Sequence, residues 1–544
     1  MLKALTCLKD AASTAIYGAR ASNGIIVITT KNARKKGKID IDFSSNLSIF
    51  EKRNMDYADN FYMNAEQQVK LESDYYEYYY FNNNGEVSNP LSSTSSAING
   101  GSSGISPIQY AYYQLATNKI TRDQLNTVLN SLKKNDFAKE YGEAIYRRQV
   151  RQQYNLSLRN SSEKFQSNLT FNYKSDNSGI INTEQNQLNI SYKGVYEVAP
   201  WLTATFGING IYSNSKEAGY DYNSSHTNPW AHPAYESMYN SDGSTKPYYY
   251  WYNGNEYWAS KGAEGFYDLG VDIRSEFFNN VQTTDRQNSR YHGNLLFKIV
   301  KGLSANVQFI YENEHTTTKW HANTESHVAR SIRNAYTKVE AGKVTYLTPR
   351  TGGMLRTTNT DGRYWTGRGQ LDYSNTFGKH TITALAGLEF RQTKYNGTRS
   401  LILGYDEQLQ NSSTHTIDFG ALGLLRNGPS YMSGSYPASQ FVFNPYLRDG
   451  MGIVVEQFHR YGSGYANFTY TYDEKYNVFG SFRKDYADVY GLNSKFRGKP
   501  LWSVGAGWNI HNESFAKNIN WINFLKLRVS YGVTGNIYQG QPAI

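Results

Sequence analysis

Residues 202–212 read LTATFGINGIY, and alternate side chains in this stretch are apolar. Leu202, Ala204, Phe206 and Ile208 share one face of an extended chain, and threonine, glycine and asparagine occupy the positions between them. Because successive side chains of a β-strand point to opposite faces, the stretch predicts a strand with one apolar face. The same alternation recurs at residues 39–50, 164–174, 303–311, 382–390, 466–472, 502–510 and 525–533. The sequence therefore predicts an all-β fold of about a dozen antiparallel strands.

The connections between these strands alternate between short and long. The short ones fall at residues 161–163, 198–200, 301–302, 378–380 and 473–475. The long ones span residues 50–148, 214–286, 318–361 and 395–450. Tight turns at one end and long loops at the other are typical of an outer-membrane β-barrel, whereas several long loops at one end of a soluble sandwich would be unusual. We therefore expect a transmembrane antiparallel β-barrel.

Aromatic side chains stand beside the short turns, at Trp201, Phe377, Tyr472 and Tyr476. Such rings form the girdle of a membrane barrel at the level of the lipid headgroups. Aromatic residues are also favoured in any β-strand. Together with the alternating connection lengths, their position favours a girdle.

Composition excludes several classes of protein. The mean hydropathy is −0.65, and no stretch approaches the ~20 apolar residues of a membrane-spanning helix. The net charge is +10, but basic and acidic residues are mixed along the chain, so we expect no nucleic-acid partner. With Cys7 as the single cysteine, the sequence has no disulfide framework. Residues 1–10 lack the apolar core of a signal peptide, and we expect the true start to lie upstream.

The first residues differ in kind from the rest. Residues 8–31 read LKDAASTAIYGARASNGIIVITTK. Leu8–Gly18 predicts a short helix that ends at glycine, and Ile25–Lys31 predicts a strand that is apolar on both faces and hence buried. Helix-like spacing also occurs at residues 56–71 and 121–132, and the Ser/Gly/Asn-rich stretch at residues 88–106 predicts a flexible loop.

This opening segment closely resembles the end of the plug domain of TonB-dependent receptors, in the wording of their SusC/RagA branch. The likeness is carried by Leu8, Lys9, Asp10, Tyr17, Gly18, Asn23 and Gly24. Residues 154–158, 228–243 and 525–536 are similar to later parts of the same family. The resemblance implies that residues 1–35 are the C-terminal end of an α+β plug domain. Residues 36–544 would then be part of a 22-stranded barrel with long extracellular loops.

The resemblance also implies a function. Proteins of this family lie in the outer membrane of Gram-negative bacteria and import a nutrient, usually a glycan and sometimes a peptide. A SusD-like surface lipoprotein delivers the substrate, and TonB opens a path by pulling on the plug through its N-terminal part. We therefore expect TonB-dependent import of a glycan, with outer-membrane lipid around the barrel and with no cofactor.

Aromatic residues in the long connections are candidates for substrate binding, because aromatic faces stack on sugar rings. The same rings could instead pack loop against loop or dock the lipoprotein. The candidates are Trp230, Trp251, Tyr252, Trp258 and Trp320.

No catalytic pattern accompanies them. The histidines lack the spacing of an HExxH metal site, and no nucleophile elbow is present. We therefore expect neither an enzyme nor a metal site. Two other functions stay open: a non-transporting outer-membrane receptor or adhesin, and a secreted soluble carbohydrate-binding β-protein. The plug-like segment argues against the first, and the alternating connection lengths argue against the second.

Overall fold

The computed structural model of this protein describes most of the chain. The described residues are 2–8, 25–30, 37, 39–56, 61–88, 91–95, 105–218, 229–249, 262, 265–340, 343–412, 452–488, 500–517, 521 and 523–533. Most of the predicted N-terminal helix lies outside these residues.

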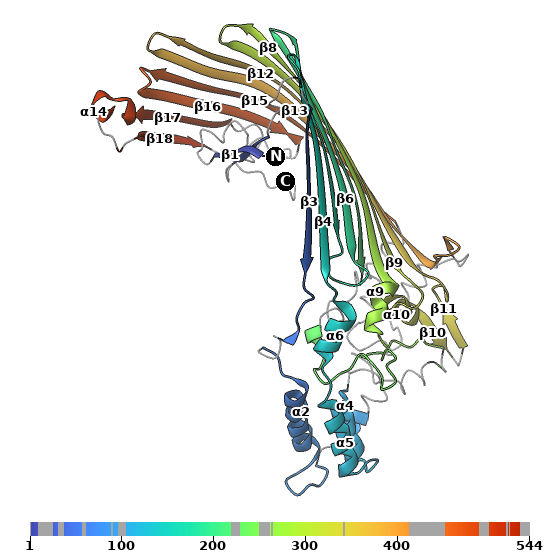
Figure 1. Ribbon diagram of the computed structural model, residues 1–544. Coiled ribbons are helices and arrows are strands. Elements are labelled where there is room, and N and C mark those ends of the chain that lie inside the picture. Colours follow the sequence, from blue (N-terminus) through green and yellow to red (C-terminus); the bar gives the residue numbers. More distant parts are fainter. Residues whose placement is uncertain are drawn as a thin grey trace.

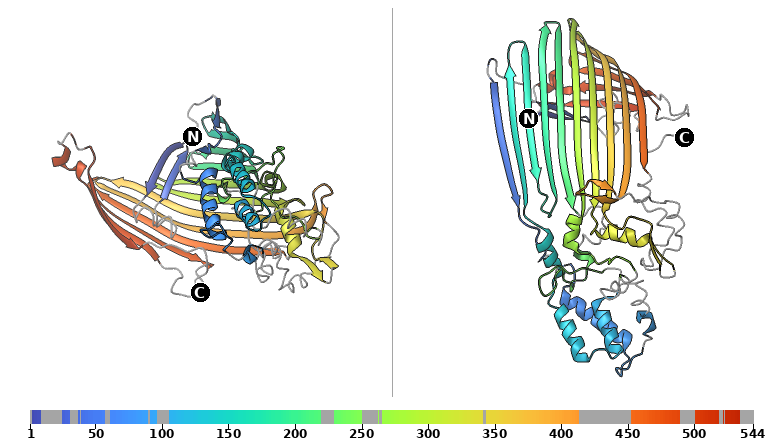
Figure 2. Two further views of the ribbon diagram at one scale, coloured as in Figure 1. Left: turned by 90° about the horizontal axis from the view of Figure 1, so that it is seen from below. Right: turned by 90° about the vertical axis from the view of Figure 1, so that its right-hand side faces the viewer.

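One large antiparallel sheet of 14 strands dominates the molecule, and it bends into an open trough (Figures 1 and 2). In chain order, each strand of the main path pairs with the next strand of that path. In order, these strands are β3 (Ile39–Phe50), β4 (Gln149–Ser161), β5 (Phe165–Asp176), β6 (Glu184–Ala199), β7 (Leu202–Ala218), β8 (Asn280–Val300), β9 (Leu303–Ala322), β12 (Gly353–Phe377), β13 (His380–Asp406), β15 (Ile453–Tyr472), β16 (Tyr476–Ala487), β17 (Pro500–Asn509) and β18 (Lys526–Val533). The short β14 (Asn411–Ser412) pairs with β13. The prediction of an antiparallel all-β fold is confirmed.

The sheet has one apolar and one polar face, because the register aligns the alternation of neighbouring strands. Phe43 lies opposite Leu156, and Phe171 and Ile190 continue the same row across β5 and β6. The adjacent row holds only polar side chains on these four strands. In a barrel the apolar face turns outward to lipid and the polar face lines the interior. The two faces are called the apolar face and the polar face below.

The tight turns all lie at one end of the sheet and the longest connections lie at the other, as predicted. Short turns join β4 to β5, β6 to β7, β8 to β9, β12 to β13 and β15 to β16. We call this the short-turn end and the opposite one the long-loop end. Next to the short turns, Trp201 stacks on Phe297 at 6.3 Å and Tyr476 stacks on Trp508 at 6.4 Å between ring centroids. Trp201 and Tyr476 are exposed, and both pairs of rings lie where an interface girdle would be.

Several strands are longer than the sequence pattern predicts. β12 has 25 residues and β13 has 27, whereas ~9–11 residues are enough to cross a membrane. The long connections predicted at residues 318–361 and 395–450 are correspondingly shorter, because β9 runs to Ala322, β12 begins at Gly353 and β13 runs to Asp406. Outside the bilayer both faces of a strand meet water, so the apolar alternation that marks a strand is lost there.

A helical unit covers the long-loop end (Figure 1). Its helices are α2 (Ala65–Tyr80), α4 (Pro107–Ala116), α5 (Arg122–Leu132) and α6 (Phe137–Ile145). α5 matches the prediction, with Thr121 and Gln124 forming a capping box. α2 begins nine residues later than the predicted start at residue 56, because Asn64 and Gln67 form its capping box. Val69, Ile108, Leu125 and Tyr235 are fully or almost fully buried in the core of this unit. None of the helices in the described part of the chain is long and apolar enough to cross a membrane.

A second unit at the long-loop end contains α9 (Ile273–Asn279), α10 (His327–Ala335) and the hairpin of β10 (Thr337–Glu340) and β11 (Lys343–Tyr346). Two further short elements, η3 (Pro229–Ala231) and α14 (Ser514–Lys517), lie in other connections. The N-terminal residues form a separate two-stranded antiparallel sheet of β1 (Leu2–Leu8) and β2 (Ile25–Thr30). β2 matches the predicted strand, but Leu8 ends β1 and does not begin a helix.

Glu276 joins α9 to α10. Its Oε1 accepts a hydrogen bond of 2.8 Å from the backbone N–H of His327, and its Oε2 is buried with no partner among the described residues. Burial is the main reason that the pKa of this carboxyl is raised to about 7. The charge of Asp272 also raises this pKa, whereas the hydrogen bond from His327 and the charge of Arg330 lower it. A raised pKa means that the folded state favours the protonated acid. This unit is therefore most stable below the unfolded pKa of 4.5 and loses that stability as the pH rises through about 7.

We predict that Glu276→Gln slows amide hydrogen exchange in α10 at pH 8, because glutamine keeps the acceptor for His327 and removes the buried charge. The variant should raise the free energy of opening α10 at pH 8 by at most about 3 kcal/mol. Hydrogen exchange measured at pH 5.5 and pH 8, corrected for intrinsic rates, should show a pH dependence in the wild type that the variant loses. Glu66→Gln, at an exposed position in α2, is the matched control. An unchanged pH dependence in Glu276→Gln would contradict this account of α10.

The turn between β8 and β9 gives a second prediction. Gly302 has φ +84°, and a Cβ there would lie 2.6 Å from the carbonyl oxygen of Ser374. Gly378 occupies the equivalent turn between β12 and β13 with φ +58°, but a Cβ there would meet no atom within 4 Å. Gly302→Ala should lower the free energy of unfolding by ~2 kcal/mol or more, and Gly378→Ala should lower it by ~1 kcal/mol. Both alanines would be strained by the left-handed backbone, but only the alanine at position 302 would also clash with a backbone atom. Urea unfolding followed by tryptophan fluorescence measures both; equal losses would refute the close contact at Gly302.

Candidate functional site

A ladder of side-chain amides crosses the polar face from β3 to β6. Asn155, Asn172 and Asn189 lie directly opposite one another on neighbouring strands, with Ser44 at the end of the row. Asn189 Nδ2 donates to Asn172 Oδ1 at 2.9 Å, Asn172 Nδ2 donates to Asn155 Oδ1, and Asn155 Nδ2 donates to Ser44 Oγ at 3.3 Å. Each amide has two N–H groups and two lone pairs, so each keeps hydrogen-bonding capacity toward the space that this face lines. The row suits a ligand that carries many hydroxyl groups.

The polar face changes character on β12 to β16, where arginines pack on an aromatic ring. The guanidinium carbons of Arg368 and Arg483 lie 4.8 and 5.6 Å from the ring centroid of Tyr465. Arg368 Nε donates to the Tyr465 hydroxyl, which donates to Gln370 Oε1 at 2.9 Å. Tyr465 is only 4% exposed. The Tyr465 ring and the guanidinium groups of Arg368 and Arg483 therefore pack together as one cluster on the polar face.

Carboxylates balance one of these arginines. Arg483 Nε donates to Asp485 Oδ1 at 2.6 Å, and its Nη2 lies 3.7 Å from Glu389 Oε1. The same Nη2 donates to Ser463 Oγ at 2.9 Å. Arg368, by contrast, donates to the neutral partners Tyr465 and Gln370. This half of the polar face thus presents charged groups where the β3–β6 half presents neutral amides.

A third feature is a pocket of ≈ 630 Å³ at the long-loop end. It lies between the residues that precede α2, the link from α5 to α6, and η3. Tyr62 and Trp230 stack in it with ring centroids 4.7 Å apart and planes 6° from parallel. Three lysines (Lys133, Lys134, Lys139) and three carboxylates (Asp56, Glu66, Asp136) line it, so its charge is balanced. A pocket with aromatic and polar walls and no net charge fits a neutral polar ligand.

Of the five predicted substrate-binding residues, the structure describes Trp230 and Trp320, and these two lie in different places. Trp230 lines the pocket just described. Trp320 is fully buried in β9 instead of lying in a loop; its Nε1 donates to Asn280 Oδ1 at 2.6 Å, and Arg356 lies 4.8 Å from its ring. Trp320 therefore packs the end of the sheet and offers no surface to a ligand. Trp251, Tyr252 and Trp258 lie outside the described residues, as do all the predicted plug-motif residues except Leu8.

Sequence reasoning missed the amide ladder and Tyr62. The three asparagines are far apart along the chain, and only the register of β4, β5 and β6 makes them neighbours. Their position on the polar side of alternating strands was the one signal available. In the described parts of the chain, no group of three or more histidine, cysteine, aspartate or glutamate side chains is placed to hold a metal ion.

Comparison with known proteins shows which ones this chain is similar to. No family model matches the chain. The chain is 23% identical over 542 residues to TonB-dependent receptor P26 of Formosa agariphila, which covers 98% of this chain and 43% of that protein. It is 46% identical over 48 residues to TonB-dependent receptor SusC of Bacteroides thetaiotaomicron, which covers 9% of this chain and 5% of SusC.

The fold is also similar to solved structures. The RagAB peptide importer in its closed-closed state superposes with a TM-score of 0.67 at 18% identity, over 98% of this chain and 51% of that chain. The chain thus spans about half the length of P26 and of the RagAB chain on which it superposes. In its sequence and in its two-faced antiparallel sheet, the chain is thus similar to SusC/RagA-type TonB-dependent receptors, which are proteins of the Gram-negative outer membrane.

Proposed function

We propose that this chain forms the plug end and part of the barrel wall of a receptor that imports a glycan across the outer membrane by a TonB-dependent mechanism. The observation that carries the proposal is the two-faced sheet. Its apolar face suits lipid, and its polar face presents the amide ladder and the arginine cluster to the interior. A wall of this kind lets a hydrated polar substrate pass without burying unpaired polar groups.

Two features support a glycan as the substrate. Neutral amides at regular strand spacing can exchange hydrogen bonds with successive hydroxyl groups, and the Trp230–Tyr62 pair offers an aromatic surface near the entrance. A peptide is the second candidate, because the similar RagAB proteins are named a peptide importer. The charged half of the wall, around Arg368 and Arg483, suits a peptide better than a neutral sugar.

The proposal includes two protein partners. A SusD-like lipoprotein would cap the long-loop end, and TonB would act on the plug. The helical unit at that end exposes large apolar side chains that a partner could cover: Phe61 is 77% exposed and Tyr78 of α2 is 84% exposed. Apolar surface of this kind commonly marks a protein interface.

The test uses cells that carry the complete receptor and its lipoprotein. A fluorescent oligosaccharide should accumulate inside the outer membrane, and collapsing the proton gradient should stop accumulation while leaving surface binding intact. Trp230→Ala should weaken oligosaccharide binding roughly 3- to 10-fold, because one aromatic contact is worth about 0.5–1.5 kcal/mol. Trp521→Ala removes an equally large ring, 82% exposed at the short-turn end, and should leave binding unchanged.

The outcomes separate the candidates. Accumulation of a labelled peptide but not of any oligosaccharide would overturn the glycan proposal and keep the importer. Binding that never leads to gradient-dependent accumulation would overturn import and favour a surface receptor.

A further inference from the structure

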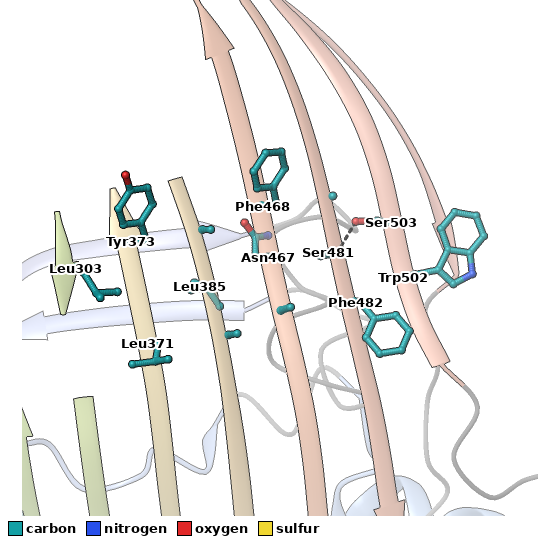
Figure 3. Close-up of a pocket in the computed structure, with 14 residues that line it drawn as sticks. Leu303, Leu371, Tyr373, Leu385, Asn467, Phe468, Ser481, Phe482, Trp502 and Ser503 are labelled. Carbon is teal, nitrogen blue, oxygen red and sulfur yellow. Dashed lines mark hydrogen bonds between the residues drawn. The ribbon is translucent and has the colours of Figure 1, made fainter. Parts of the chain in front are cut away.

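The apolar face carries a groove that neither the import path nor the long-loop end uses. It has a volume of ≈ 550 Å³, within the ~300–1,000 Å³ typical of small-molecule sites. Figure 3 shows the side chains around it, with the rings of Tyr373, Phe468, Phe482 and Trp502 spread over four strands. Its lining is almost entirely apolar.

Register explains why the groove exists. On the apolar face, β13 carries Ala384 and Ala386 and β15 carries Ala466, whereas β12 carries Leu371 and Tyr373. Ala386 pairs with Leu371 on one side and with Ala466 on the other, and Phe482 follows on β16. Small side chains therefore form a floor along β13, and large ones form two walls.

The groove lies close to the short-turn end. Ala384 is four residues beyond His380, the first residue of β13, so the floor begins ~13 Å along the strand from the turn. The hydrocarbon core is ~30 Å thick, and a tilted strand rises less than its own length. The floor thus lies in the half of the bilayer that adjoins the short turns, which in an outer-membrane barrel is the periplasmic leaflet.

Polar groups mark the headgroup level below the groove. His380 Nδ1 and the Tyr470 hydroxyl lie 2.6 Å apart, and the Tyr472 ring is 5.2 Å from the His380 ring. Both tyrosines follow Phe468 along the apolar face of β15. Amphipathic rings of this kind sit at the boundary between acyl chains and headgroups.

Lys301 carries a positive charge beside this boundary, and among the described residues no carboxylate pairs with it. Lys301 lies two residues before Leu303, which lines the groove. The turn that contains Lys301 is held to β12 by a hydrogen bond of 2.7 Å from Ser374 N–H to the Gly302 carbonyl. Lys379 and Lys475, in the neighbouring turns, both pair with Asp473 at 3.4 and 3.2 Å. Within the part of the chain that the structure describes, Lys301 has no acidic partner. Its ammonium group is therefore available to a phosphate.

From this juxtaposition we propose that the groove is a binding site for one glycerophospholipid of the periplasmic leaflet. One acyl chain lies along β13 over Ala384 and Ala386, between the walls of Leu371 and Phe482. The lipid phosphate lies at the level of His380 and Tyr470, within reach of Lys301. The site needs no cargo and does not depend on the substrate of the receptor.

The experiment is native mass spectrometry of the complete receptor in detergent, titrated with 1-palmitoyl-2-oleoyl phosphatidylethanolamine. The wild type should retain one lipid after the others have dissociated. Ala386→Phe and, separately, Ala466→Phe fill the floor and should abolish this retention. Lys301→Glu should weaken it by up to about fivefold, the effect of losing one exposed ion pair between the lysine ammonium and the lipid phosphate. Migration of the folded form on unheated gels shows that each variant folds.

Two control variants make the test specific. Ala204→Phe places the same ring on the apolar face of β7, away from the groove, and Lys164→Glu changes a lysine in the turn between β4 and β5; both should retain the lipid. Equal retention by all five variants would mean exchangeable lipid around the barrel and would overturn the proposal. A dimer that Ala386→Phe abolishes would also overturn it, since the groove would then hold a second copy of the chain.

Discussion

The antiparallel hydrogen-bond ladder between neighbouring strands is the interaction on which the rest of this structure depends. Inside a membrane no water can satisfy backbone N–H and C=O groups, so every strand must pair on both sides. The main path of the sheet meets this demand from β4 to β17, with each strand paired to the one before and the one after it. Its edges, β3 and β18, are unpaired on one side within the described residues, and lipid would leave those groups unsatisfied. The chain spans about half the length of the RagAB chain on which it superposes.

The backbone hydrogen bonds also determine which side chains face lipid and which face the interior. Once the register is fixed, alternate residues must face lipid or the interior, and a shift by one residue would exchange the two faces. The amide ladder of Asn155, Asn172 and Asn189 and the lipid-facing floor of Ala384 and Ala386 are products of the same register. One row serves a polar substrate, and the other offers space to an apolar chain.

Sequence reasoning found the features that depend on local periodicity. Period-two alternation identified strands such as β7 and β9, and helix-like spacing identified α5. It missed what depends on tertiary context. Trp320 follows the run of residues 316–319, TTTK, which lacks alternation, so the sequence predicted a loop where β9 continues and buries the ring. The nine-residue helix α6 was missed because so short a segment shows barely two turns of periodicity. The facing asparagines could not be found because cross-strand register cannot be read from one sequence.

The orientation of the two faces is the central claim, and cysteine scanning with spin labels measures it most directly. In the complete receptor, with Cys7 replaced by serine, each residue from 305 to 311 of β9 would be replaced in turn by a labelled cysteine. The account predicts a period of two: labels at positions 305, 307, 309 and 311 are accessible to oxygen dissolved in lipid, and those at 306, 308 and 310 to a water-soluble nickel reagent. Equal access to the nickel reagent at all seven positions would contradict it and would place this sheet in water.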